Sequence, residues 1–122
     1  MATILNVLFA LLFLSLAAQG YGQCSTSQIS VSQSQTGATV GNKPEFQVTI
    51  TNGCTCSQSD VKLGCNGFQT VESIPSSVLS VSGGECLVND GQPLGPGVTI
   101  SFKYAWDNSF SFSPISSEIN CS

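Results

Sequence analysis

The chain has 122 residues, which is enough for one domain and too few for a second once a targeting segment is removed. Only 8% of the residues are charged, the formal net charge is −4, and histidine is absent. The three cationic residues, Lys43, Lys62 and Lys103, stand apart in the sequence, so no basic patch can neutralise phosphates. The composition therefore argues against nucleic acid and anionic membranes as partners.

The N-terminal residues have the pattern of a secretory signal peptide. An apolar run over residues 4–18 is followed by small residues that suit cleavage after Gly20 or Gly22. The run is shorter than the roughly 20 apolar residues that span a bilayer, and no cluster of lysines or arginines follows it. We expect residues 1–22 to be removed and residues 23–122 to form a secreted, extracellular domain without a membrane anchor.

Beyond the signal segment, apolar and polar residues alternate, and Gly, Pro or Asn interrupts the pattern every eight to twelve residues. Ile29–Ser32 is the first predicted strand and is expected at a sheet edge. Glu45–Thr51 follows and ends at Asn52–Gly53, a dipeptide suited to positive φ in a tight turn. Val61–Cys65 is the next predicted strand, and Asn66–Gly67 indicates a turn after it.

Shorter strands are predicted in the second half of the chain, at Phe68–Val71, Val78–Val81 and Cys86–Val88. The clearest alternation runs over Val98–Trp106, where five apolar side chains share one face, and Phe110–Phe112 is the last predicted strand. No segment keeps the apolar spacing of a helix. The prediction is an all-β fold, a single disulfide-bonded antiparallel β-sandwich of about 7 to 9 short strands, with Trp106 in its core.

All six cysteines follow the signal segment, and an even number in a secreted chain predicts three disulfides. Cys54 and Cys56 are too close for an easy mutual bond, which leaves twelve of the fifteen possible pairings open. Zinc is the alternative, but the chain has no histidine and its Cys-x-Cys spacing is not that of a structural zinc site. We therefore expect disulfides, no metal and no cofactor. The predicted disulfide residues are Cys24, Cys54, Cys56, Cys65, Cys86 and Cys121.

The sequence contains no recognisable catalytic motif, and we predict no catalytic residues. Histidine, the common general base, is absent, and no Gly-x-Ser-x-Gly elbow presents a serine nucleophile. A carboxylate-based hydrolase stays as an alternative, although the acids fit solvated surface and turn positions better. Its candidate acids are Glu45, Asp60, Glu72, Glu85, Asp90, Asp107 and Glu118.

Four aromatic residues close together in the sequence offer a second alternative, a cell-wall carbohydrate-binding β-sandwich without catalysis. Tyr104, Trp106, Phe110 and Phe112 could form a platform for a sugar or a peptide. Tyr104 and Trp106 share the apolar face of their predicted strand, however, which favours core packing for those two rings.

Several ordered blocks of the chain resemble the tapetum determinant family of plants, small secreted cysteine-rich proteins. The resemblance extends from Cys24 to Cys121, and the block Cys86–Gly91, with the sequence Cys-Leu-Val-Asn-Asp-Gly, is the most specific. The other blocks are Ile29–Gln33, Pro44–Asn52 with the following Cys54, Cys65–Phe68, and Ile100–Ala105.

The resemblance implies an apoplastic ligand for the ectodomain of a leucine-rich-repeat receptor kinase, acting in cell fate specification in anthers, with tapetum formation as the family role. This chain departs from the family's founding member because it passes almost directly from signal peptide to Cys24, without a long basic extension. It also has Tyr104-Ala105-Trp106 where the founder has Tyr-Ala-Asn, so receptor and tissue could differ. The receptor-binding residues are unknown, and exposed loops such as Asn89–Pro96 are the expected contacts.

Overall fold

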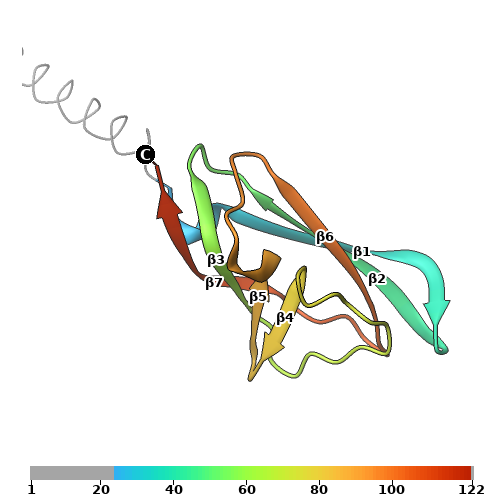
Figure 1. Cartoon of the computed structure of the whole chain (residues 1–122). Coiled ribbons are helices and arrows are strands. Elements are labelled where there is room, and N and C mark those ends of the chain that lie inside the picture. The colour runs from blue at the N-terminus through green and yellow to red at the C-terminus, as the bar shows by residue number, and fades with distance from the viewer. Residues whose placement is uncertain (1–23, 122) are drawn as a thin grey trace, which may run out of the picture.

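A computed structural model describes residues 24–121 of the chain, and they form two antiparallel sheets (Figure 1). The predicted signal peptide, residues 1–22, lies outside the described residues. The prediction of an all-β fold is confirmed, because the described residues contain seven strands and only two short 3₁₀ turns. The elements are η1 (Thr26–Gln28), β1 (Ile29–Val40), β2 (Lys43–Asn52), β3 (Ser57–Gly64), β4 (Leu79–Ser82), β5 (Glu85–Val88), η2 (Asn89–Gly91), β6 (Thr99–Ala105) and β7 (Ser113–Asn120).

One sheet has the strand order β1-β2-β6 and the other the order β4-β5-β3-β7. In the first sheet, Phe46 lies opposite Tyr104 and Val48 lies opposite Phe102. Since side chains alternate across a strand, this register turns all four of these apolar residues to the same face, where they are buried. The second sheet contributes Val61, Leu63, Cys86 and Val88 from β3 and β5, also buried.

The centre of the core is a cluster of aromatic rings around Tyr104, whose ring stacks on Phe46 with 5.1 Å between centroids. Phe112 packs edge-on against Tyr104 at 5.8 Å. Trp106 is not the central residue that the alternation predicted, because β6 ends at Ala105 and the indole is only half-buried. Val98, at the other end of the predicted strand, is 43% exposed because it lies before β6 begins.

Two predicted strands are wrong, and one strand was missed. Phe68–Val71 and Phe110–Phe112 lie in irregular segments whose aromatic side chains reach into the core without being part of a sheet. The missed strand is β7, which has the polar sequence Ser-Pro-Ile-Ser-Ser-Glu-Ile-Asn and shows little apolar alternation. It joins the sheet by pairing along β3, which supplies backbone hydrogen bonds whatever the side chains are.

Three disulfides join the described cysteines, as the even number predicted: Cys24 to Cys54, Cys56 to Cys121, and Cys65 to Cys86. The sulfur atoms of Cys24, Cys54 and Cys56 lie within 4.8 Å of one another. All three are bonded in disulfides, so they offer no thiolate to a metal ion. The first two bridges together fasten both ends of the described chain to the Cys-x-Cys segment that follows β2.

Asn52 is a buried junction residue and not the positive-φ turn residue that the sequence suggested. Its side-chain nitrogen donates hydrogen bonds to the carbonyl oxygens of Cys56 at 2.9 Å and Leu94 at 2.8 Å. Its side-chain oxygen accepts hydrogen bonds from the backbone N–H of Cys54 at 3.0 Å and the amide of Gln58 at 3.2 Å. One amide therefore connects the end of β2, the start of β3 and the segment before β6.

Candidate interaction surface

Residues 65–78 connect β3 to β4 and cover one open side of the sandwich; we call them the covering loop. In Figure 1 the loop leaves the end of β3, runs out to the end of β6 and returns to β4. The N–H of Val71 donates to the carbonyl oxygen of Ala105 at 3.0 Å, and the N–H of Ala105 donates to Thr70 Oγ1 at 3.0 Å. The loop is therefore fastened to the last residue of β6.

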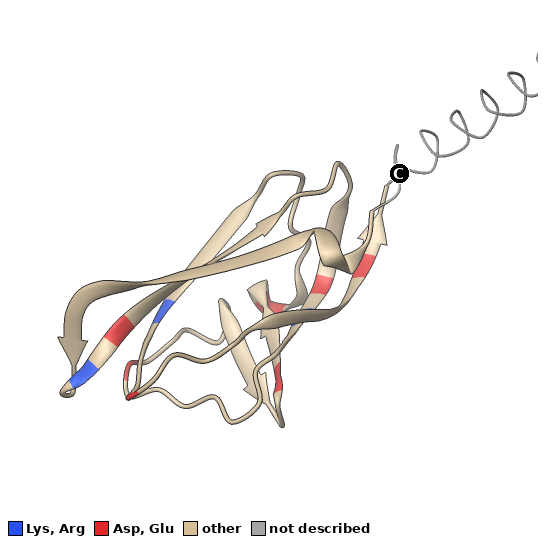
Figure 2. Ribbon diagram, turned by 180° about the vertical axis from the view of Figure 1, so that it is seen from behind, with Lys and Arg blue, Asp and Glu red and all other residues tan. Residues whose placement is uncertain are grey.

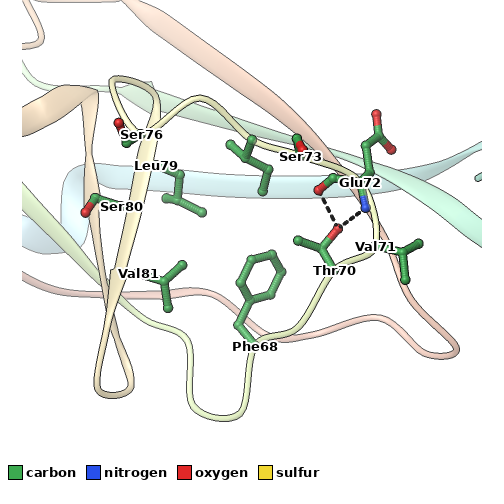
Figure 3. Close-up of a pocket in the computed structure, with 10 residues that line it drawn as sticks. Phe68, Thr70, Val71, Glu72, Ser73, Ser76, Leu79, Ser80 and Val81 are labelled. Carbon is green, nitrogen blue, oxygen red and sulfur yellow. Dashed lines mark hydrogen bonds between the residues drawn. The ribbon is translucent and has the colours of Figure 1, made fainter.

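A single aromatic side chain anchors the covering loop to the core. The ring of Phe68 makes T-shaped contacts with Tyr104, Phe110 and Phe112, at centroid distances of 5.2, 5.3 and 5.3 Å. Thr70 then fixes the bend, because its hydroxyl donates to the carbonyl oxygen of Glu72 and accepts from the N–H of Glu72, both at 3.0 Å (Figure 3). The loop is thus a defined surface held by packing and by hydrogen bonds.

Two hollows flank the covering loop. The first, of about 430 Å³, lies between the loop and β4, and Phe68, Leu79 and Val81 are among its lining residues (Figure 3). The second, of about 320 Å³, lies between the loop and β6. Val71 and Val81 are 47% and 50% exposed beside the first hollow, so this side of the molecule combines concave shape with accessible apolar surface.

Two carboxyl groups meet where the covering loop approaches β2. Glu45 is 8% exposed and accepts a hydrogen bond from the hydroxyl of Thr36 at 2.7 Å. Glu72 lies near enough to Glu45 for each carboxyl group to shift the pKa of the other, and among the described residues no N–H or O–H group donates to the buried Oε1 of Glu72. A proton on one of the two groups removes their repulsion, since two bare carboxylates repel each other.

The pKa values of the two carboxyl groups move apart. The Thr36 hydrogen bond, assisted by Glu72, lowers the pKa of Glu45, whereas loss of hydration, assisted by Glu45, raises the pKa of Glu72. Lys103 in β6 favours the charged form of both groups, but more weakly. As pH falls, Glu72 therefore takes up a proton before Glu45 does.

The covering loop, its two hollows and its acid pair form the candidate interaction surface. The match to a family model for the C-terminal part of tapetum determinant 1 spans residues 25–122, which is nearly the whole described chain. The chain belongs to the tapetum determinant 1 family. No solved structure matches it.

Two relatives of this tapetum determinant domain come from Arabidopsis thaliana, and both are 36% identical to it. The match to "TPD1 protein homolog 1" covers 80% of this chain and 55% of that protein, and the match to an uncharacterized protein covers 92% and 89%. "TPD1 protein homolog 1A" of Oryza sativa subsp. japonica is 28% identical, over 75% of this chain and 43% of that protein. The chain thus spans about half the length of the two relatives that carry the TPD1 name.

The structure of this tapetum determinant domain gives the four grouped aromatic residues a packing role. Tyr104 and Phe112 are buried, and Phe110 is half-buried and packs on Phe68. Trp106 is half-buried and lies under the ammonium group of Lys43, which is 5.3 Å from the ring centroid. The rings face one another or a lysine, and the described residues place none of them on an exposed platform.

Of the seven candidate acids, the structure brings Glu45 and Glu72 close enough for each to shift the pKa of the other. Asp107 is bound to Lys43 at 2.6 Å. The other acids are spread over β3, β5, η2 and β7, and Figure 2 shows the acids dispersed over the molecule. Asp60 and Glu118 line a separate hollow on the β3–β7 face.

The segment Asn89–Pro96, where we expected receptor contacts, is held firmly to β3. The N–H of Leu94 donates to the carbonyl oxygen of Gln58 at 2.8 Å, and the N–H of Gln58 donates to the carbonyl oxygen of Leu94 at 3.0 Å. Leu94 is buried, while Asp90, Gln92 and neighbouring residues are exposed. The part of this segment in receptor binding stays a prediction.

The sequence analysis missed the covering loop because Phe68–Val71 has the pattern of a strand, although Pro75 and the polar residues around it break the alternation.

Proposed function

We propose that this protein is a secreted signalling ligand for the ectodomain of a leucine-rich-repeat receptor kinase, acting in cell fate specification of the anther or tapetum type. The observation that carries the proposal is the family match over residues 25–122. The architecture supports it, because three disulfides and a packed covering loop hold a shaped surface in place before any partner arrives. The proposal assigns the protein a binding role and no enzymatic activity.

The ligand proposal includes export to the apoplast. We propose that residues 1–22 direct secretion and that residues 23–122 are the mature protein. Three disulfides suit an oxidising compartment. Within the described residues, no helix has the length and apolar character needed to cross a membrane. Expression of the full chain in plant cells tests this part: the secreted protein should begin near Gln23, and retention of the uncut chain in the cells would contradict it.

Receptor binding is tested with oxidised residues 23–122 and purified leucine-rich-repeat receptor kinase ectodomains. Saturable binding that is lost after reduction and alkylation is the expected result, since the disulfides shape the surface. The folded state of the oxidised sample is verified by its circular dichroism and its disulfide map. Failure of this folded protein to bind the ectodomains would reject the proposal for those receptors. Specific hits on a cell-wall glycan array would instead favour the carbohydrate-binding alternative.

A further inference from the structure

β6 has a free edge, because it is the last strand of the sheet β1-β2-β6. The carbonyl oxygen of Val98 accepts a hydrogen bond from the N–H of Asn52, and the N–H of Trp106 donates one to the carbonyl oxygen of Pro44. The backbone groups of the even-numbered residues of β6 therefore bond to β2. The N–H and carbonyl of Ala105 point the other way, to the covering loop. The two-residue repeat of a strand therefore directs the backbone groups of Thr99, Ser101 and Lys103 away from β2. Among the described residues, these groups have no hydrogen-bond partner.

The covering loop already occupies one end of this edge. At Ala105 it adds a short strand-like contact through the N–H of Val71. Further along, the loop diverges from β6 and leaves the hollow of about 320 Å³ between them. The hollow is lined by Phe102 and Lys103 of β6 and, across from them, by apolar residues of the loop, among them Ile74 and Val78. The edge and the hollow together form a slot that is open to an extended chain.

We propose that the β6 edge binds an extended segment of a partner protein by strand addition, antiparallel to β6 along Thr99–Lys103. The segment carries an apolar side chain beside Phe102 and an acidic side chain beside Lys103. This inference rests on the proposed binding function and names the surface through which that function acts. Backbone hydrogen bonds supply the affinity, and the alternate side chains supply the selectivity.

The apolar preference follows from the geometry of an added strand. A residue placed beside Phe102 turns its side chain to the same face as Phe102. On that face it meets Ile74, Pro75 and Val78, which line the hollow. Burying a valine-sized side chain there is favourable because it removes apolar surface from water.

The acidic preference follows from Lys103, whose exposed side chain lies beside the slot, near the end that the covering loop occupies. The one ion pair found among the described residues joins Lys43 to Asp107, and Lys103 attracts Glu45 and Glu72 without forming an ion pair with either, so its ammonium group can still pair with an acid of a partner. A second copy of this chain is a poor occupant, because β6 itself contains no acid and each copy carries a net charge of −4. The occupant is therefore a segment of a different protein.

The probe is the peptide acetyl-Thr-Glu-Val-Thr-Val-Thr-amide, which places Glu beside Lys103 and the first Val beside Phe102. It is titrated into ¹⁵N-labelled residues 23–122, and amide exchange is followed by NMR. Slower exchange is expected at Thr99, Ser101 and Lys103, because their N–H groups gain acceptors. The same peptide N-methylated at Glu and at the central Thr should bind at least about tenfold more weakly, since its own donors are removed.

Proline at Ser101 blocks the edge without disturbing the sheet, because the N–H that it removes has no partner within the domain and edge strands accept proline. Ser101→Pro should weaken peptide binding at least about tenfold. Gln35→Pro is the matched control. Gln35 lies opposite Phe46, and the backbone groups of Phe46 bond to β6 and not to β1. The N–H of Gln35 therefore also points away from β2, to the free edge of β1. This control should bind the peptide like the unaltered protein.

The outcomes separate this inference from the ligand proposal. Protection of the β6 amides by the peptide, with no binding to any receptor ectodomain, would support the edge and reject the receptor. Receptor binding that Ser101→Pro leaves intact, with unprotected β6 amides, would overturn the edge and leave the ligand proposal standing. Protection that grows with protein concentration alone, together with a dimer in light scattering, would overturn it by assigning the edge to a second copy.

Discussion

Asn52 shows how much one buried amide can organise. Its side chain is fully buried and makes hydrogen bonds to backbone or side-chain groups of Cys54, Cys56, Gln58 and Leu94. Truncation would leave several of those groups buried without partners, and each such loss costs about 1 to 3 kcal/mol. The sequence indicated a turn here, and the actual role depends on contacts with residues more than forty positions away.

Asn52→Ala should therefore lower the free energy of unfolding by about 3 kcal/mol, measured by urea denaturation. Asn108→Ala is the matched control, because Asn108 is exposed, and its effect should stay within about 0.5 kcal/mol. Equal effects of the two substitutions would contradict the proposed role of Asn52.

The acid pair gives the covering loop a dependence on pH. The pKa of Glu72 is raised, so its proton stabilises the folded state fully below the ordinary value of 4.5, and this contribution is lost as pH rises through the raised pKa. The pKa of Glu45 is lowered, so its carboxylate stabilises the folded state above 4.5, and this contribution is lost as pH falls through the lowered pKa. The pair is most stable in the acidic range between the two pKa values.

Glu72→Gln should remove the loss of stability that the unaltered protein shows as pH rises from about 4.5 to neutrality, because the amide keeps a donor towards Glu45 at every pH. Urea unfolding at several pH values measures this slope. Glu85→Gln, at an exposed position, should keep the slope. A slope that survives in Glu72→Gln would show that another group is responsible.

Among the elements, the covering loop depends on the single ring of Phe68. Phe68→Ala should lower the free energy of unfolding by about 2 to 3 kcal/mol, less than for a fully buried phenylalanine because Phe68 is half-buried. The substitution should also speed amide exchange at Val71, whose hydrogen bond fastens the loop to β6. Gln69→Ala, at the exposed neighbouring position, should change neither quantity. Unchanged exchange at Val71 in Phe68→Ala would show that the hydrogen bonds alone hold the loop.

The sequence predicted those strands whose own side chains divide between core and solvent. β2 and β6 were found because Phe46, Val48, Phe102 and Tyr104 alternate with polar residues. β7 was missed because its place in the sheet depends on β3 and not on its own apolar residues. The segments around Phe68 and Phe110 were misread, since an aromatic side chain can reach the core from a loop as well as from a strand.

For the molecule as a whole, the three disulfides differ in their access to solvent. Cys65 and Cys86 are 1% and 0% exposed, whereas Cys121 is exposed and Cys24 is half-buried. Under native conditions with a low concentration of dithiothreitol, the Cys65–Cys86 bridge should be reduced last, about tenfold more slowly or more, because thiol attack needs access. Timed alkylation and mass spectrometry of the labelled cysteines measure the order. Early labelling of Cys65 or Cys86 would contradict this expectation.

The number of disulfides was predictable at this scale, and their pairing was not. Which cysteines bond to each other depends on which segments the sheets bring together. In the ladder of β3 and β5, Cys86 lies opposite Leu63, and this places Cys86 close to Cys65, two residues further along the chain. The candidate surface was hidden for the same reason. Glu45 and Glu72 are far apart in the sequence, and the path of the covering loop brings them near enough to shift each other's pKa.

The paired bridges at the Cys-x-Cys segment also determine how the domain can be attached to something else. Cys24 and Cys121 are both held at one pole of the sandwich, and the turn between β1 and β2 lies at the other pole (Figure 1). A linker joined at either end of the domain therefore leaves from the same pole. Immobilisation on a sensor surface through an N-terminal or a C-terminal tag should present the molecule in one orientation, with the hairpin turn directed into solution.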